Sequence, residues 1–257
     1  MNTRDKFTAF YTILIKEVLR FSRIWLQTIF PPMITTGLYF VIFGGLIGSR
    51  IGEMQGFNYM DFIVPGLIMM AIITSAYANV VSSIYLSKFS HSIEEMLVSP
   101  VPNYIILLGY LGGGVARGLS VGVAVTIVSL FFSDLHIHNF WVIISVAILT
   151  ATLFSLAGFI NGVFAQSFDD ISIIPTFVLT PLTYLGGIFY SVTLLPAFWQ
   201  KVSMGNPILY MINAFRYGVL GVSDISLWIS YAIILAFITV LFIFCLVMLN
   251  RGTGIRN

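Results

Sequence analysis

Six long apolar segments constrain this chain more than any other feature. Each is close to the roughly 20 residues that a helix needs to cross a bilayer. Only 9% of the residues are charged, whereas soluble domains carry about 25%, so the chain cannot cover a water-facing surface. We therefore predict an all-α polytopic membrane protein, a single transmembrane domain over residues 1–257 with six transmembrane helices. The predicted spans are about 24–48, 61–87, 105–132, 140–165, 172–190 and 227–250.

Composition and motifs exclude several other classes. A net charge of +2 without a long basic run excludes nucleic acid as a partner. Cys245 is the single cysteine, which excludes an intramolecular disulfide and a cysteine-based zinc site. His136 and His138 share a short loop but have too few neighbouring ligands to hold a metal. The sequence contains neither HExxH nor the Walker A pattern GxxxxGKS/T, so we expect no catalytic, metal-binding or cofactor-binding residues.

Residues 5–23 precede the first span and have the pattern of an amphipathic helix. Lys16, Arg20 and Arg23 fall largely on the side opposite the apolar stripe. A basic amphipathic helix that leads into a span is typical of an element lying in the membrane interface. The alternative is a cytosolic helix that packs on a soluble core. The apolar stripe consists of Phe7, Phe10, Tyr11, Leu14, Ile15 and Val18.

The segment 191–226, between the fifth and sixth spans, is apolar but interrupted. Pro196, Gly205 and Pro207 divide it into pieces too short to cross a membrane. Backbone at membrane depth is tolerated only where protein or water satisfies its hydrogen bonds. We therefore predict two short re-entrant helices that pack against other spans.

The distribution of basic residues predicts the orientation. Of the 12 Lys and Arg residues, eight lie on the side of the two termini, three lie on the opposite side, and Arg117 falls within a span. Because Lys and Arg are enriched in cytoplasmic loops, this asymmetry places both termini in the cytoplasm.

Arg117 lies within the third span, in the glycine-rich stretch Gly109–Gly118. A guanidinium in hydrocarbon costs at least about 2.5–3.5 kcal/mol, which favours a role in a polar pathway or in pairing across helices. The alternative is an arginine that snorkels to the interface. The four-residue spacing of Gly109, Gly113, Gly114 and Gly118 predicts close helix packing.

The loop 88–104 contains a short amphipathic pattern. Ile93, Met96 and Leu97 form an apolar patch beside Glu94 and Glu95. We interpret the patch as a docking element for a partner, the alternative being a solvated loop with two surface acids. A second acidic pair, Asp169 and Asp170, begins the fifth span and is placed to cap a helix N-terminus.

Several motifs resemble those of one family. The stretch Tyr59–Gly66, which contains Pro65 and Gly66, resembles the start of the second span in type-2 ABC (ABC-2) exporter permeases. Ile93–Val101 resembles the coupling loop of that family. Its C-terminal signature is similar to motifs here that contain Pro175, Pro181, Pro196, Asn206, Pro207 and Tyr210. The resemblance covers nearly the whole chain and is closest to Gram-negative inner-membrane permeases related to nodulation-factor and daunorubicin exporter permeases.

The resemblance implies half of an exporter in the bacterial inner membrane. Two permease chains would pair around a pathway, and two copies of a separate ABC ATPase subunit would bind ATP and dock on the cytoplasmic face. The N-terminal helix and residues 93–97 would contact the ATPase, and the segment after the fifth span would form short helices in the outer leaflet. The few charges in the spans favour an amphipathic or lipid-linked substrate, or a drug, moved outward.

Two other functions fit a polytopic membrane protein. An ion-coupled secondary transporter usually has carboxylates deep in its spans and internal repeats, whereas Asp61 here lies at the end of a span. A membrane scaffold without transport activity would have no evident use for the interrupted segment 191–226.

Overall fold

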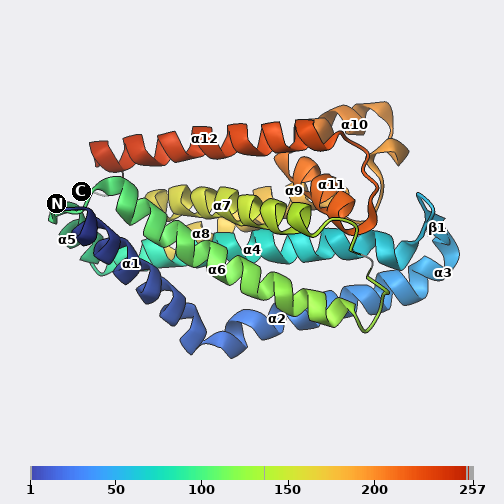
Figure 1. Ribbon diagram of the computed structural model, residues 1–257, viewed down its shortest axis with the longest axis horizontal. Helices are drawn as coiled ribbons and strands as arrows, with labels where there is room; N and C mark the ends of the chain where they lie inside the picture. Colours follow the sequence, from blue (N-terminus) through green and yellow to red (C-terminus); the bar gives the residue numbers. More distant parts are fainter. Residues whose placement is uncertain (1, 136, 253, 255–257) are drawn as a thin grey trace.

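The computed structural model describes residues 2–135, 137–252 and 254, with the backbone alone for Ser49, so the predicted surface residue His136 lies outside the described residues. The described chain is helical apart from one two-stranded hairpin, which confirms the all-α class (Figure 1). The elements are α1 (Thr3–Arg23), α2 (Trp25–Tyr39), the π-helix η1 (Phe40–Ile47), α3 (Gly48–Ile51), β1 (Glu53–Met54), β2 (Phe57–Asn58), α4 (Tyr59–Phe89), α5 (Ser92–Val98), α6 (Asn103–Ser129), α7 (Phe140–Phe164), α8 (Phe168–Ile174), the π-helix η2 (Pro175–Leu179), α9 (Thr180–Leu185), the 3-10 helix η3 (Val192–Leu194), α10 (Ala197–Met204), α11 (Pro207–Leu220) and α12 (Leu227–Arg251).

Among the described residues, five helices are long and apolar enough to cross a membrane: α2 with η1, α4, α6, α7 and α12. The predicted span 172–190 differs from them. It consists of the consecutive segments α8, η2 and α9, and its helical part ends at Leu185, before the turn at Gly186 and Gly187. Pro175 and Pro181 each lie in the first turn of a new segment, η2 and α9, where a missing N–H group removes a hydrogen bond to the segment before.

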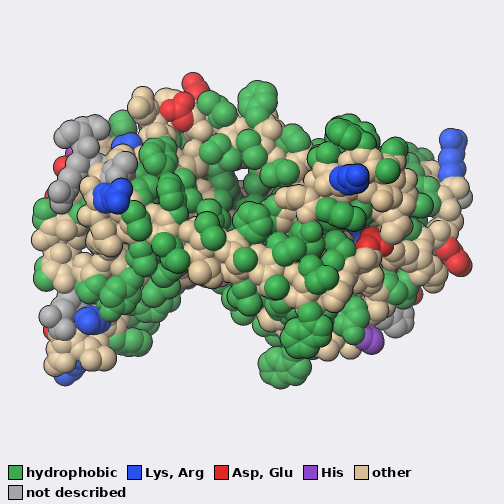
Figure 2. Space-filling model, turned by 90° about the horizontal axis from the view of Figure 1, so that it is seen from above, with side chains coloured by type: hydrophobic (Ala, Val, Ile, Leu, Met, Phe, Trp, Pro, Cys, Tyr) green, Lys and Arg blue, Asp and Glu red, His purple; other side chains and the backbone are tan. Residues whose placement is uncertain are grey.

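The long helices run between two distinct ends of the molecule. The start of α1, the end of α12 and the short helix α5 lie at one end, which we call the terminal end (Figure 1). The β1–β2 hairpin, α3 and α10 lie at the other, the hairpin end. In Figure 2, hydrophobic side chains cover most of the visible face, and charged side chains lie toward the two ends. This distribution matches a bundle that crosses a membrane along its length.

Helix α4 forms the centre of the bundle, packed between α6 and α7. Glycines on both neighbours bring the backbones together. A Cβ on Gly158 of α7 would lie 2.6 Å from the carbonyl oxygen of Tyr77, and one on Gly118 of α6 would lie 3.0 Å from the Cβ of Ala76. The prediction that the glycines of α6 serve helix packing is confirmed.

The chain between α9 and α12 contains the two predicted short helices, α10 and α11. Asn206 caps α11, because its side chain accepts a hydrogen bond from the Ile208 N–H at 3.0 Å and donates one to the Leu182 carbonyl at 2.6 Å. Pro207 occupies the first turn, where its missing N–H costs nothing. Helix α11 is largely buried against α4, α7 and α12, so the prediction of a packed short helix is confirmed for α11. Helix α10 does not follow it, because Ser203 is its only buried residue and Phe198 is 68% exposed.

Candidate functional site

Helix α1 has the predicted amphipathic pattern, but its orientation differs from the prediction. Phe7 of the apolar stripe is 67% exposed, whereas Glu17 is fully buried. The glycines of α6 account for this, since a Cβ on Gly113 would lie 2.4 Å from the Cβ of Glu17. The helix therefore turns Ile13, Leu14, Glu17 and Phe21 toward the bundle and leaves much of its apolar stripe uncovered. Arg20, on the side opposite the stripe, also reaches into the protein.

Glu17 and Arg20 connect α1 to α4 through a polar network. The Arg20 Nη2 group donates to the Asn79 carbonyl at 2.7 Å and to the Glu17 carboxylate at 3.1 Å. Ser83 Oγ donates to the other Glu17 oxygen at 2.7 Å. A buried carboxylate requires a counter-charge and hydrogen-bond donors, and Glu17 has both. The network therefore ties the membrane-proximal half of α1 to the central helix.

The short helix α5 lies at the terminal end, as predicted, and its apolar side is partly covered. Ile93 is only 1% exposed and belongs to a core cluster built by α4, α6, α7 and α12, against which Met96 and Leu97 pack. Ile93 is therefore not free to enter a partner, whereas Met96 and Leu97 are only half-buried, and their role in docking stays a prediction. Glu94 and Glu95 are exposed, as is Val98, which is 81% exposed.

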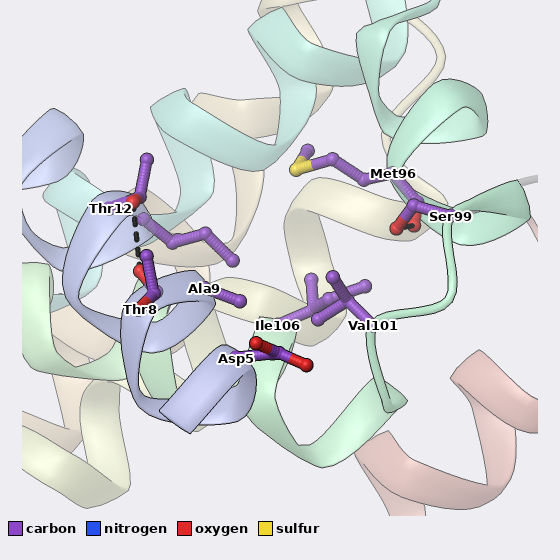
Figure 3. A pocket seen from close by; sticks show the side chains of 9 residues that line it. Asp5, Thr8, Ala9, Thr12, Met96, Ser99, Val101 and Ile106 are labelled. Atoms are coloured by element: carbon purple, nitrogen blue, oxygen red, sulfur yellow. Dashed lines mark hydrogen bonds between the residues drawn. The ribbon is translucent and has the colours of Figure 1, made fainter. Parts of the chain in front are cut away.

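A cleft of about 420 Å³ separates α1 from α5 and the start of α6 (Figure 3). In Figure 3 the side chains of Asp5, Thr8 and Ala9 approach the cleft from α1, and those of Met96 and Val101 approach it from the opposite side. The cleft therefore lies between the two elements that the sequence pattern assigns to partner docking. Its full lining is Asp5, Thr8, Ala9, Thr12, Ile13, Met96, Ser99, Val101 and Ile106.

One face of α4 remains uncovered. Between residues 62 and 87, every side chain of α4 is buried except those at every fourth position: Met70, Thr74, Ala78, Ser82 and Leu86. We call these five residues the α4 open face. A groove of about 260 Å³ separates its first part from α2, and a groove of about 410 Å³ separates its second part from α8 and η2. Both grooves contain hydroxyl groups, including those of Thr35, Thr36, Ser172 and Thr176.

Aromatic side chains connect the two flanks of the α4 open face near the hairpin end. The hydroxyl groups of Tyr39 and Tyr184 lie 3.2 Å apart, and the rings of Phe43 and Phe189 stack with centroids 4.5 Å apart. These side chains come from α2, η1, α9 and the turn that follows α9. The flanks contain the π-helices η1 and η2, a rare geometry that is frequent at functional sites.

The signature residues shape the hairpin end. A Cβ on Gly66, which follows Pro65 in α4, would lie 2.8 Å from the Cα of Ile188, so only glycine permits this approach. Tyr210 of α11 donates its hydroxyl to the Met204 carbonyl at 2.7 Å. The remaining signature residues mark element boundaries: Pro175 begins η2, Pro181 lies in the first turn of α9, Pro196 caps α10, and Asn206 and Pro207 begin α11.

Sequence reasoning counted Arg216 among the three basic residues on the side opposite the termini and did not predict its burial. The side chain is fully buried: its Nη2 donates to the Gly187 carbonyl at 2.6 Å, and its guanidinium carbon lies 3.9 Å from the centre of the Phe62 ring. Arg216 thereby joins α11, α4 and the turn after α9. The sequence signal for this burial was the apolar stretch around Arg216, which folds into a largely buried helix.

Of the acidic pair at the start of α8, Asp170 caps that helix, as predicted. Ser167 and Asp170 form a capping box, in which each side chain accepts a hydrogen bond from the other residue's N–H group. Hydrogen bonds from the Gln166 N–H, and then from Ser167, hold the pKa of Asp170 below its usual range. The carboxylate stays ionised and stabilises the exposed first turn.

Arg117 lies in the middle of α6 and is half-buried. Its Nε is buried without a hydrogen-bond partner among the described residues. The expected pairing with another helix is thus not found in the part of the chain that the structure describes.

Comparison with known proteins agrees with this architecture. The ABC-2 type transporter family matches residues 8–220. The chain is 59% identical to the Escherichia coli K12 inner membrane transport permease YadH over 250 residues, which cover 97% of each chain. It is 21% identical to nodulation protein J of Rhizobium leguminosarum biovar viciae, with 92% of each chain covered. The helical bundle, its signature residues and these similarities together show that the chain belongs to the ABC-2 type transporter family.

Proposed function

We propose that this chain is the permease subunit of an ATP-driven exporter in the bacterial inner membrane, and that two copies pair so that their α4 open faces enclose one pathway. The observation that carries the proposal is the α4 open face itself. The most buried helix of the bundle leaves uncovered a single line of residues at every fourth position. A second copy would cover this line and leave a shared groove between the two chains.

The chemistry of the groove favours amphipathic cargo. Threonine and serine hydroxyls alternate with methionine, alanine and leucine along the α4 open face, and Tyr39 and Tyr184 lie at its hairpin end. Such a surface offers hydrogen bonds to a polar head and contact area to an apolar tail. Cargo with these properties includes lipid-linked molecules and many drugs.

The terminal end is the proposed docking site for two copies of a separate ABC ATPase. The predicted cytoplasmic orientation of the termini puts α1, α5 and the cleft between them on the side where ATP is available. Glu94, Glu95 and Val98 are the exposed groups of α5 that a partner would meet. The chain carries no Walker A loop, so in this proposal the partner binds and hydrolyses the ATP.

Contacts within the permease connect the proposed ATPase-docking elements, α1 and α5, to the helix that lines the proposed pathway. A displacement of α5 acts on α4, against which α5 packs, and a displacement of α1 acts on α4 through the Glu17–Arg20 network. Rotation of α4 against α2 and α8 would open and close the grooves beside its open face. The motion is therefore delivered to the helix that lines the proposed pathway.

The test begins with co-purification of the tagged permease and an ABC ATPase encoded beside it. We then expect Thr74→Trp, which fills the groove beside α2, to reduce cargo-stimulated ATP hydrolysis at least tenfold. Val240→Trp on α12 is the matched control, because Val240 is 65% exposed on a helix outside the grooves. Full stimulation in Thr74→Trp would exclude the α4 open face as the pathway. Transport that continues without any ATPase but requires an ion gradient would favour a secondary transporter.

A further inference from the structure

The depth of Arg117 is the first part of the argument. It lies 14 residues after Asn103, the first residue of α6, and 12 residues before Ser129, the last. At 1.5 Å per residue, its Cα is about 21 Å from one end of the helix and about 18 Å from the other. Gly113, one turn earlier in α6, meets Glu17 of α1, so Arg117 is level with the end of α1, where the chain enters its first span at Trp25. At this level its buried Nε has no hydrogen-bond partner among the described residues, which is unfavourable.

The charges around Arg117 do not balance. Lys16 and Arg20 share the single carboxylate of Glu17, at 3.9 and 3.1 Å. Arg20 also lies near enough to repel Arg117 electrostatically. The donors of Arg20 already serve Glu17, Asn79 and Ser82. In the described part of the chain, no carboxylate lies within 4 Å of Arg117, so the cluster has an excess of positive charge.

A second copy of this chain offers no suitable carboxylate. Among the ten acidic residues of the sequence, Glu17 alone falls well inside a membrane-proximal helix, and it is already paired. The other nine lie in strand β1, in connecting loops or in the first turns of helices: Asp5, Glu53, Asp61, Glu94, Glu95, Asp134, Asp169, Asp170 and Asp224. An anion that reaches the middle of α6 must therefore come from the membrane.

We propose that Arg117 binds the phosphate group of an anionic amphiphile that enters laterally from the bilayer. A guanidinium matches phosphate with two parallel hydrogen bonds, and basic sites between transmembrane helices on the cytoplasmic side bind lipid head groups. Arg20, whose charge acts on Arg117, donates to Ser82, one of the five residues of the α4 open face, so the positive cluster extends to that face. The inference deepens the proposed function by naming phosphate as a feature of the ligand, although binding can be measured without ATPase or transport.

The experiment is ligand binding to the purified full-length permease in a neutral detergent, followed by native mass spectrometry. Dioleoyl phosphatidic acid is the probe, and dioleoylglycerol, which has the same tails without phosphate, is its control. We expect phosphatidic acid to bind at least tenfold more tightly than dioleoylglycerol. Arg117→Gln should reduce that preference at least fivefold. Arg117→Lys keeps the positive charge but lacks the planar guanidinium, and it should reduce the preference about threefold. Arg23→Gln is the matched control, because Arg23 is an exposed arginine of the same region and should change nothing.

Two further probes identify the source of the phosphate. A polyprenyl phosphate that binds through Arg117 more tightly than phosphatidic acid would indicate lipid-linked cargo, and equal binding would indicate a bilayer phospholipid; both results support the inference. Inorganic phosphate that binds at Arg117 as tightly as the lipids would overturn it in favour of a free anion. Unchanged phosphatidic acid binding in a folded Arg117→Gln protein would also overturn it. A permease that binds no ATPase yet keeps this lipid preference would refute the proposed function alone.

Discussion

Helices α2–η1 and α4 have nearly the same apolarity but opposite environments. Their most apolar 18-residue stretches have mean hydropathies of 1.6 and 1.8, yet 11% of the first and 78% of the second are buried within the chain. Hydropathy therefore predicts that both cross the membrane, but it cannot tell which one forms the core. What differs is the set of small residues on the neighbouring helices.

Glycines surround α4 on two sides. Gly114 and Gly118 of α6 meet Val80 and Ala76, and Gly158 and Gly162 of α7 meet the backbone of α4. In lipid, where apolar side chains gain little from leaving one apolar solvent for another, close backbone approach and packing decide association. Helix α2 has no comparable partner among the described residues and leaves most of its surface to lipid or to a second chain.

The largest expected effect comes from filling one of these close approaches. Gly158→Val would place a side chain against the backbone carbonyl of Tyr77, which cannot move aside, so we expect a loss of about 3 kcal/mol or more in stability. Gly45→Val in η1 is the matched control, because a Cβ there meets no atom within 4 Å. Thermal unfolding in detergent and membrane abundance give the measurement. Equal stability of the two variants would contradict the contrast between the two regions.

A smaller loss is expected when the link between α1 and the core is cut. Glu17→Gln removes the carboxylate that pairs with Arg20 and accepts from Ser83, and we expect it to cost about 1–3 kcal/mol. Limited proteolysis should then cleave near the end of α1 faster than in wild type. Glu94→Gln is the control, because its pairing with His91 is exposed and contributes less than about 1 kcal/mol. Unchanged protease resistance in Glu17→Gln would mean that apolar contacts alone hold α1.

The two sides of α5 should separate stability from partner binding. Val98→Asp changes an exposed side chain, so the permease should stay folded while its affinity for the ATPase falls about tenfold, or about 1.4 kcal/mol. Ile93→Asp should instead destabilise the permease itself, because Ile93 lies within the core. Pull-down of the ATPase, normalised to permease abundance, distinguishes the two. Normal ATPase recovery with Val98→Asp would remove α5 from the docking surface.

The smallest expected effect concerns the contact between the two flanks of the α4 open face. The Tyr39–Tyr184 hydroxyl contact should contribute about 0.5–1.5 kcal/mol. A double-mutant cycle with Tyr39→Phe and Tyr184→Phe measures it, because coupled residues give a non-additive free energy. Additive effects of the two substitutions would mean that α2 and α9 are not joined there. The two flanks of the α4 open face would then be joined by aromatic stacking alone.

The sequence determined which segments are long and apolar enough to lie in a membrane, and it placed α5, α10 and α11 by their proline, glycine and acidic boundaries. These features depend on neighbours in the chain, through helix period, capping and chain breaking. The glycine spacing on α6 also predicted close packing, although not which helix each glycine would meet. The family's motifs are also contiguous stretches of sequence, so the resemblance could be found without the tertiary structure.

The tertiary structure alone decided which faces turn inward. It buried Glu17 and Arg216, placed Ile93 in a core cluster with residues of α4, α6, α7 and α12, and left α2 and one line of α4 open. In a chain that is apolar almost everywhere, the usual contrast between a polar surface and an apolar core is missing, so periodicity does not show the direction of the core. Backbone approach at glycines and the pairing of buried charges made that choice, and both depend on residues far apart in the sequence.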